Sequence, residues 1–135
     1  MYSRKRANAY ANIGLETGVM SASPHQLIVM LFDGAQAALK KAQWAIEQHD
    51  VPTKCTALSK AIRIIEEGLR ASLDKDQGGE IADNLDNLYE YMSRTLTRAN
   101  ARNDLEAIRH VDALLSDISS AWKDIAAEPQ SAVSA

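Results

Sequence analysis

The sequence contains few of the residues that form covalent cross-links, metal clusters or catalytic centres. Of its 135 residues, one is cysteine and three are histidine. The single cysteine, Cys55, excludes an internal disulfide and a cysteine zinc cluster, and it is typical of a reducing compartment. Proline and glycine are also scarce, at three and six residues, whereas alanine occurs 22 times. Because alanine loses no side-chain entropy in a helix, this composition favours helices throughout.

Long apolar runs and a large excess of charge are absent too. The longest apolar run covers residues 27–32 and stops at Asp33, well short of the about 20 residues that span a bilayer. Basic residues at positions 4–6 are followed by interspersed polar residues, not by the apolar core of a signal peptide. The formal net charge of −3 argues against a broad nucleic-acid surface. We therefore expect a cytoplasmic protein with no stable membrane insertion and no nucleic-acid partner.

Capping and turn residues divide the chain into one helical domain with a segment at each end. Residues 23–26, which are serine, proline, histidine and glutamine, are typical of a capped helix start. Pro52 and the two glycines at 78–79 interrupt the pattern. Asn103, with an acidic residue three positions later, predicts another capped start. The predicted domain covers residues 23–128, with helices at about 24–49, 52–75, 80–101 and 104–127, between an N-terminal segment at 1–22 and a flexible tail at 129–135.

Each predicted helix carries apolar residues at alternating steps of three and four, which places them on one face. Short connections between long helices make neighbouring helices antiparallel. The pattern therefore predicts an all-α fold, an antiparallel up-down four-helix bundle. The residues expected in its core are, helix by helix, Leu27, Leu31, Ala35, Ala38, Ala42 and Ala45; Cys55, Leu58, Ile62, Ile65, Leu69 and Leu73; Ile81, Leu85, Leu88, Met92, Leu96 and Ala99; and Ile108, Val111, Leu115, Ile118, Trp122 and Ile125.

A second stripe of small and apolar residues runs beside the core stripe of the second predicted helix. It consists of Ala57, Ala61, Ile64, Gly68 and Ala71. Small side chains let another helix approach closely. Tyr89 and Tyr91 lie in the same way beside the core line of the third predicted helix. Two interpretations stay open: the stripes are the flanks of a wide core face within the bundle, or they line a groove that accepts the amphipathic helix of a partner.

The first 22 residues contain aromatic and aliphatic side chains but no long helical period. We expect this segment to be mobile or to form a short helix. Such a segment either lies over an apolar surface and is displaced from it, or is a frayed terminus.

No catalytic constellation is found, so we expect no enzyme activity, no cofactor and no metal. Glu106 and His110 are the nearest approach to the Glu-x-x-His pairs of a di-iron bundle, but their spacing is too long and the pair is not repeated. A modest basic cluster consists of Arg94, Arg98, Arg102 and Arg109. The function therefore lies in a surface, and the bundle either captures a peptide or helix or assembles with itself.

Several short motifs are highly specific when their order and spacing are taken together. They are Ser23-Pro24-His25-Gln26-Leu27-Ile28, Met30-Leu31-Phe32-Asp33-Gly34-Ala35, Lys60-Ala61-Ile62, Leu73-Asp74, Gly78-Gly79-Glu80-Ile81-Ala82, Leu88-Tyr89 with Tyr91-Met92, and Ala99-Asn100. From about residue 10 to residue 122, the chain resembles the FliS family of bacterial flagellar secretion chaperones.

The resemblance implies both a fold and a function. The fold is an antiparallel four-helix bundle with a mobile N-terminal segment. The function is that of a cytoplasmic export chaperone, which binds the disordered C-terminal region of flagellin and so prevents premature polymerisation. The loaded chaperone then docks on the cytoplasmic domain of FlhA, the export-gate protein of flagellar type III secretion. Tyr10 matches the tyrosine that contributes to this docking in the family.

The flagellin-binding groove is predicted on the second and third helices. The residues assigned to it are Ala57, Ala61, Ile64, Gly68, Ala71, Leu88 and Tyr89. The alternative is a helix-bundle interaction or self-assembly module that does not bind flagellin. Exposed apolar stripes could also pair two copies, which leaves a homodimer of the unloaded protein open.

Overall fold

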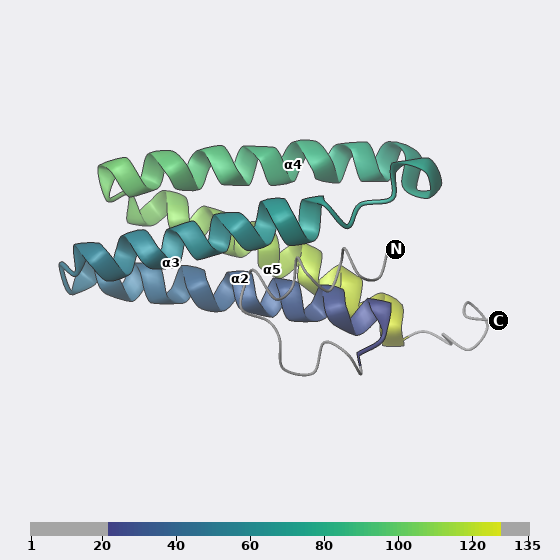
Figure 1. The fold of residues 1–135 in the computed structure, drawn as a ribbon, viewed down its shortest axis with the longest axis horizontal. Helices are drawn as coiled ribbons and strands as arrows, with labels where there is room; N and C mark the ends of the chain where they lie inside the picture. The colour runs from purple at the N-terminus through teal and green to yellow at the C-terminus, as the bar shows by residue number, and fades with distance from the viewer. Residues whose placement is uncertain (1–21, 128–135) are drawn as a thin grey trace.

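The computed structural model describes residues 22–127, and this part of the chain consists of helices and short connections, without a strand. The elements are α2 (Pro24–Glu47), α3 (Val51–Arg63), η2 (Ile64–Arg70), α4 (Lys75–Arg102) and α5 (Leu105–Ala127). Figure 1 shows α2, α3 with η2, α4 and α5 along the length of the molecule, each running antiparallel to the helix before it. The predicted all-α bundle is confirmed. The predicted N-terminal segment and tail fall almost wholly outside the described residues.

Polar side chains cap α2 and α3 where the sequence predicts a start, whereas α4 begins at Lys75, capped by Asp74, before the predicted start at about residue 80. Ser23 forms a capping box, because its Oγ accepts from the N–H of Gln26 at 3.1 Å and the Gln26 Oε1 accepts from the N–H of Ser23 at 2.8 Å. The last start differs from the prediction by one residue. Asp104, not Asn103, accepts from the N–H of Ala107 at 3.1 Å. Asn103 instead ends α4 in the left-handed conformation, with φ of 53°, which asparagine tolerates well.

The second and third helices depart from regular α-helix geometry near their shared connection. The chain is α-helical to Arg63 and continues as a π-helix from Ile64 to Arg70, a wider helix that is rare in proteins. Between Lys75 and Arg102 the helix is interrupted at Gly79, whose φ of 52° and ψ of −124° are not helical. Only glycine adopts such a conformation without strain, so the break lies at the glycine pair.

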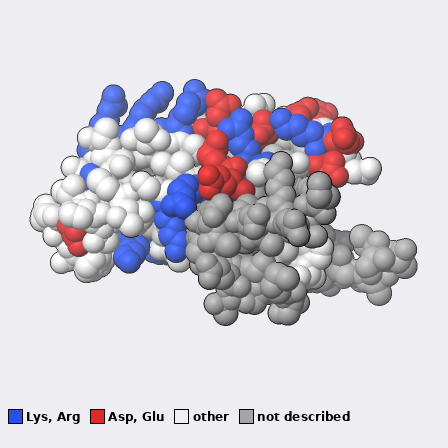
Figure 2. All heavy atoms as spheres, viewed as in Figure 1, with Lys and Arg blue, Asp and Glu red and all other residues white. Residues whose placement is uncertain are grey.

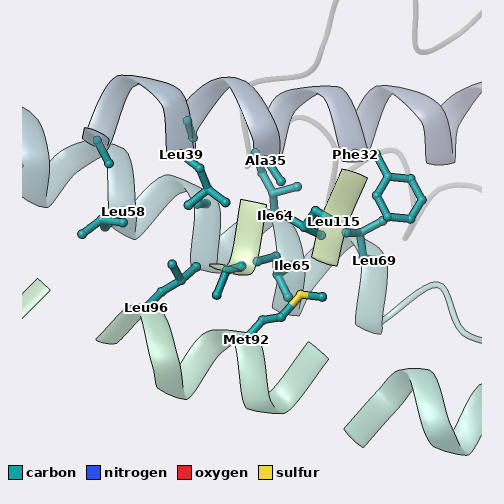
Figure 3. Close-up of a cluster of buried hydrophobic side chains, with 14 of the residues drawn as sticks. Phe32, Ala35, Leu39, Leu58, Ile64, Ile65, Leu69, Met92, Leu96 and Leu115 are labelled. Carbon is teal, nitrogen blue, oxygen red and sulfur yellow. The ribbon is translucent and has the colours of Figure 1, made fainter. Parts of the chain in front are cut away.

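The core lies along the middle of the bundle. Figure 3 shows side chains from α2, from α3 with η2, from α4 and from α5 meeting there, with Met92 and Leu96 pointing toward Ile64, Ile65 and Leu58. The first core stripe is correct throughout, since all six predicted α2 residues are buried. Two predicted core residues are wrong: Ile81 is 71% exposed and Ile125 is 48% exposed. The bundle is therefore closed along most of its length and open at one end.

Candidate functional site

An apolar groove lies at the end of the bundle where α2 begins and α5 ends, on the right in Figure 1. Ile81 follows the break at Gly79, and Ile125 lies in the last turn of α5. Neither is covered by a neighbouring helix, and both line this groove, which has a volume of about 540 Å³. The residues of the apolar groove are Ile28, Phe32, Leu69, Ser72, Leu73, Ile81, Leu85, Tyr89, Asp117, Ile118, Ala121, Trp122 and Ile125.

Two aromatic residues give the apolar groove fixed walls. The indole N–H of Trp122 donates to the backbone carbonyl of His25 at 3.1 Å, and its ring packs on the His25 ring with 4.7 Å between centroids. Tyr89 is only 3% exposed, and burial raises the pKa of its hydroxyl to about 12. Because its lining is almost entirely aliphatic and aromatic, the groove is suited to bind the apolar face of a helix.

A charged cluster on the neighbouring surface holds η2 to α4. Arg70 Nε donates to Asp86 Oδ1 at 2.6 Å, and Arg70 Nη1 donates to Glu66 Oε1 at 2.9 Å. Lys75 Nζ lies 3.1 Å from Asp86 Oδ2. These hydrogen bonds, from Arg70 first and Lys75 second, lower the pKa of Asp86. Because Leu69 lies beside Arg70 and Leu85 beside Asp86, the cluster fixes the spacing of two groove walls.

A second, smaller-residue groove lies between α2 and α3. It has a volume of about 510 Å³ and is lined by glycine, alanine, proline and threonine, with two lysines. Its residues are Gly34, Ala37, Ala38, Lys41, Pro52, Thr53, Thr56, Ala57 and Lys60. We call it the α2–α3 groove. Each of its small side chains offers little apolar area, so we expect each to contribute little to the binding of a partner.

The structure divides the predicted groove residues among several environments. Ala61, Ile64 and Gly68 are buried inside the bundle, so a partner reaches them only if the helices separate. Ala71 is exposed, and Leu88 is half-buried against the core. Two of the seven lie in grooves, Tyr89 in the apolar groove and Ala57 in the α2–α3 groove. Tyr10 lies outside the described residues.

Gly68 has a structural reason to be small. A Cβ atom placed on it would lie 2.7 Å from Cδ2 of Leu31 in α2. The glycine therefore lets η2 and α2 approach closely inside the bundle. At Gly68, this contact supports the interpretation in which the stripe of small residues is a flank of the core face.

Sequence reasoning did not assign most residues of the apolar groove to a site. Leu69, Leu73, Ile81, Leu85, Ile118, Trp122 and Ile125 all belong to the predicted core stripes. Their type and spacing are those of core residues. The apolar periodicity of a helix does not indicate where the facing helices leave a gap. One signal was available: several of these residues lie near helix ends, on either side of the glycine pair at 78–79.

Two other kinds of site find no support between residues 22 and 127. No group of three or more histidine, cysteine, aspartate or glutamate side chains there is arranged to hold a metal ion. No helix in the same range is both long and apolar enough to cross a membrane.

Comparison with known proteins gives a family. A family model of the flagellar protein FliS matches residues 6–129. The flagellar secretion chaperone FliS of Salmonella typhimurium is 58% identical over 125 residues, covering 93% of this chain and 93% of the relative. The protein of the same name from Escherichia coli K12 is 48% identical over 129 residues, covering 96% and 95%. That of Bacillus subtilis is 33% identical over 108 residues, covering 80% and 79%. The chain therefore belongs to the FliS family of flagellar proteins.

Proposed function

We propose that this protein is a cytoplasmic export chaperone that holds the C-terminal region of flagellin in the apolar groove. The names of its relatives, flagellar secretion chaperones, support the export role. The observation that carries the proposal is the exposure of large apolar side chains at the open end, led by Ile81 at 71% and Ile125 at 48%. A bundle of this size has no structural need to leave them uncovered, whereas a binding surface does.

The groove suits a disordered and amphipathic substrate. Burial of apolar area contributes about 25 cal/mol per Å², and the apolar groove presents aliphatic walls from all the helices around it. Ordering the bound segment opposes this by about 2–5 kcal/mol, which keeps the complex reversible. A flagellin terminus whose apolar face is covered in this way has no face left for another flagellin. Sequestration therefore prevents polymerisation without a nucleotide or a catalytic step.

The α2–α3 groove is the second part of the proposed surface. It contains the predicted residue Ala57, and Lys41 and Lys60 lie in its lining. An extended chain leaving the apolar groove along α2 would reach it, because α2 contributes residues to both grooves. Its small side chains predict a weaker contribution to affinity than that of the apolar groove.

Calorimetric titration with the C-terminal segment of the cognate flagellin tests the proposal. We expect saturation near one to one and a negative heat-capacity change. The double variant Ile81→Glu/Ile125→Glu should weaken binding by about tenfold or more, which corresponds to at least about 1.4 kcal/mol. Both positions are exposed, so the fold should survive, as far-UV circular dichroism can check. The matched control is Val51→Glu, an equally exposed apolar residue outside both grooves.

Two results would contradict this assignment. Equal affinity of the double variant and the Val51→Glu control would remove the apolar groove from the binding surface. No heat with the wild-type protein would favour the alternative, an interaction or self-assembly module that does not bind flagellin.

We also propose that Tyr10 contributes to the docking of the loaded chaperone on the cytoplasmic domain of FlhA. We expect Tyr10→Ala to leave flagellin binding unchanged and to weaken binding of the loaded complex to that domain. Tyr2→Ala, in the same segment, is the matched control. Biolayer interferometry with immobilised FlhA domain measures both, and equal gate affinity of the two variants would overturn the role of Tyr10.

A further inference from the structure

The apolar groove is bordered by acidic side chains. Among the described residues that line it, Asp117 alone carries a charge. Three more carboxylates, those of Asp74, Glu80 and Asp124, each adjoin a lining residue in the sequence. All four residues are exposed, and Figure 2 shows acidic side chains gathered at the upper right, over the first half of α4. We call these four residues the acidic rim.

No ion pair formed within residues 22–127 involves the acidic rim. The cations that lie near it in the sequence are already paired with other carboxylates. Arg70 and Lys75 both contact Asp86, at 2.6 Å and 3.1 Å. Lys123 Nζ lies 3.4 Å from Asp33 Oδ1. The rim therefore offers its carboxylates to a cation from outside the bundle.

Helix stability accounts for only half of the acidic rim. The N-terminus of a helix favours negative charge, and the C-terminus favours positive charge. Asp74 caps α4, and Glu80 directly follows the break at Gly79, so both suit the start of a helix. Asp124 lies near the end of α5, where the helix dipole disfavours it, and Asp117 lies about two turns earlier on the same side of that helix. Helix stability therefore gives no reason for these two carboxylates.

The α2–α3 groove carries the opposite charge. Its lining contains Lys41 and Lys60 and, among the described residues, no carboxylate. Neither lysine takes part in an ion pair formed between residues 22 and 127. The two grooves therefore differ in charge as well as in the size of their side chains. Because complementary charge sets specificity at an interface, a segment of one sign fits one groove better than the other.

We propose that the apolar groove selects an amphipathic segment whose apolar face is flanked by lysine or arginine. The apolar face enters the groove, and the basic flanks lie along the acidic rim. This inference rests on the proposed function, because it takes the groove to be a binding surface, and it adds the charge that the bound segment carries. Apolar burial supplies most of the affinity. The rim acts on the choice of segment and on its rate of association, and it repels a segment with acidic flanks.

Calorimetric titration of the full chain with two designed helical peptides tests the selection. Both peptides have the same length and the same apolar face, and one carries lysines on its flanks where the other carries glutamates. At about 0.01 M salt, where the screening length is about 30 Å, the lysine peptide should bind about tenfold more tightly, since several exposed ion pairs contribute together. At about 1 M salt, where screening acts within about 3 Å, the two affinities should converge.

Charge reversal on α5 assigns the preference to the acidic rim. Asp117→Lys/Asp124→Lys changes two exposed positions, so the fold should survive, and the variant should lose most of the preference for the lysine peptide. The matched control is Glu47→Lys/Glu106→Lys, which changes the net charge by the same amount at two exposed positions outside both grooves. The control should keep the preference of the wild type. Circular dichroism checks that both variants are folded.

The outcomes separate this inference from the proposed function. Equal affinity of the wild type for the two peptides at about 0.01 M salt would overturn the inference, even if the C-terminal segment of flagellin binds. An equal loss of preference in the α5 variant and in its control would overturn it too, because net charge and not the rim would then decide. No heat with either peptide would mean that another part of the protein or a second copy covers the groove, and would also overturn it. A preference for the lysine peptide without any binding of flagellin would support the charge selection and overturn the flagellin assignment alone.

Discussion

The two ends of this bundle are built from the same helices but differ in what their side chains leave uncovered. At the end with the α2–α3 and α4–α5 turns, alanines on three helices are buried, among them Ala45, Ala57 and Ala99. Lys54, in the first turn of α3, links this helix to the end of α4, because its Nζ donates to the Asn100 carbonyl at 2.9 Å and to Asn103 Oδ1 at 2.6 Å. At the other end, large apolar side chains line a groove of about 540 Å³.

The difference shows how one apolar pattern buries side chains at one end of the bundle and leaves them exposed at the other. Small side chains let helices approach closely and close the space between their axes. Large side chains at diverging ends stay apolar in the sequence but remain accessible to a partner. We therefore expect the closed end to contribute mainly to folding and the open end to contribute mainly to the proposed binding of flagellin.

The largest expected contrast is between truncations at the two ends. Leu58→Ala removes a fully buried side chain and should lower the free energy of unfolding by about 2–5 kcal/mol. Ile81→Ala, at 71% exposure, should change it by no more than about 0.5 kcal/mol. Urea unfolding followed by circular dichroism measures both. Similar losses in the two variants would mean that the groove is part of the stability core.

A second contrast concerns two positions in the small stripe of the second helix. Gly68→Leu forces a side chain into Leu31, 2.7 Å from the added Cβ, and should destabilise the fold by about 1–3 kcal/mol. Ala71→Leu introduces the same residue one turn later at an exposed position, where the expected change is within about 0.5 kcal/mol. If the two variants unfold at the same urea concentration, the close approach of η2 and α2 is not a constraint.

The smallest effect depends on pH and concerns the charged cluster beside the groove. Arg70 and Lys75 lower the pKa of Asp86 in the folded protein, relative to about 3.9 in the unfolded chain. The carboxylate therefore stabilises the fold above pH about 4, and this contribution is lost as pH falls through the lower folded pKa. Asp86→Asn should be less stable than wild type at neutral pH and should converge with it in acid.

An exposed carboxylate gives the reference for that experiment. Asp124→Asn, near the end of α5, should follow the wild type across the same pH series in urea unfolding. A difference between Asp86→Asn and wild type that is constant from neutral to strongly acidic pH would show that packing, not charge, links η2 to α4.

The sequence was sufficient to predict the helices and the closed part of the core. The apolar spacing of α2 placed Leu31, Ala35 and Ala42 correctly, because period alone decides which face of a helix is apolar. It placed Ile81 and Ile125 in the core wrongly, because period does not say whether a neighbouring helix covers that face. The π-helix at Ile64–Arg70 has no distinctive residue pattern apart from Gly68, so it was not predictable.

The candidate site was predictable only in part for the same reason. Tyr89 was assigned from its place beside a core stripe, and it does line the apolar groove. Trp122 was assigned to the core, and its role as a groove wall depends on the hydrogen bond to the His25 carbonyl, 97 residues away in sequence. A contact of that range is fixed by the tertiary arrangement and not by local pattern.

The most direct test of the central claim, that flagellin binds at the open end, is methyl NMR of isoleucine-labelled protein during titration with the C-terminal segment of flagellin. Isoleucines lie in both regions: Ile28, Ile81, Ile118 and Ile125 line the apolar groove, whereas Ile65 and Ile108 are fully buried in the closed core. We predict large shifts for the methyls of the four groove isoleucines and small shifts for those of the two core isoleucines. Shifts confined to the core methyls, or none in the groove, would contradict the account.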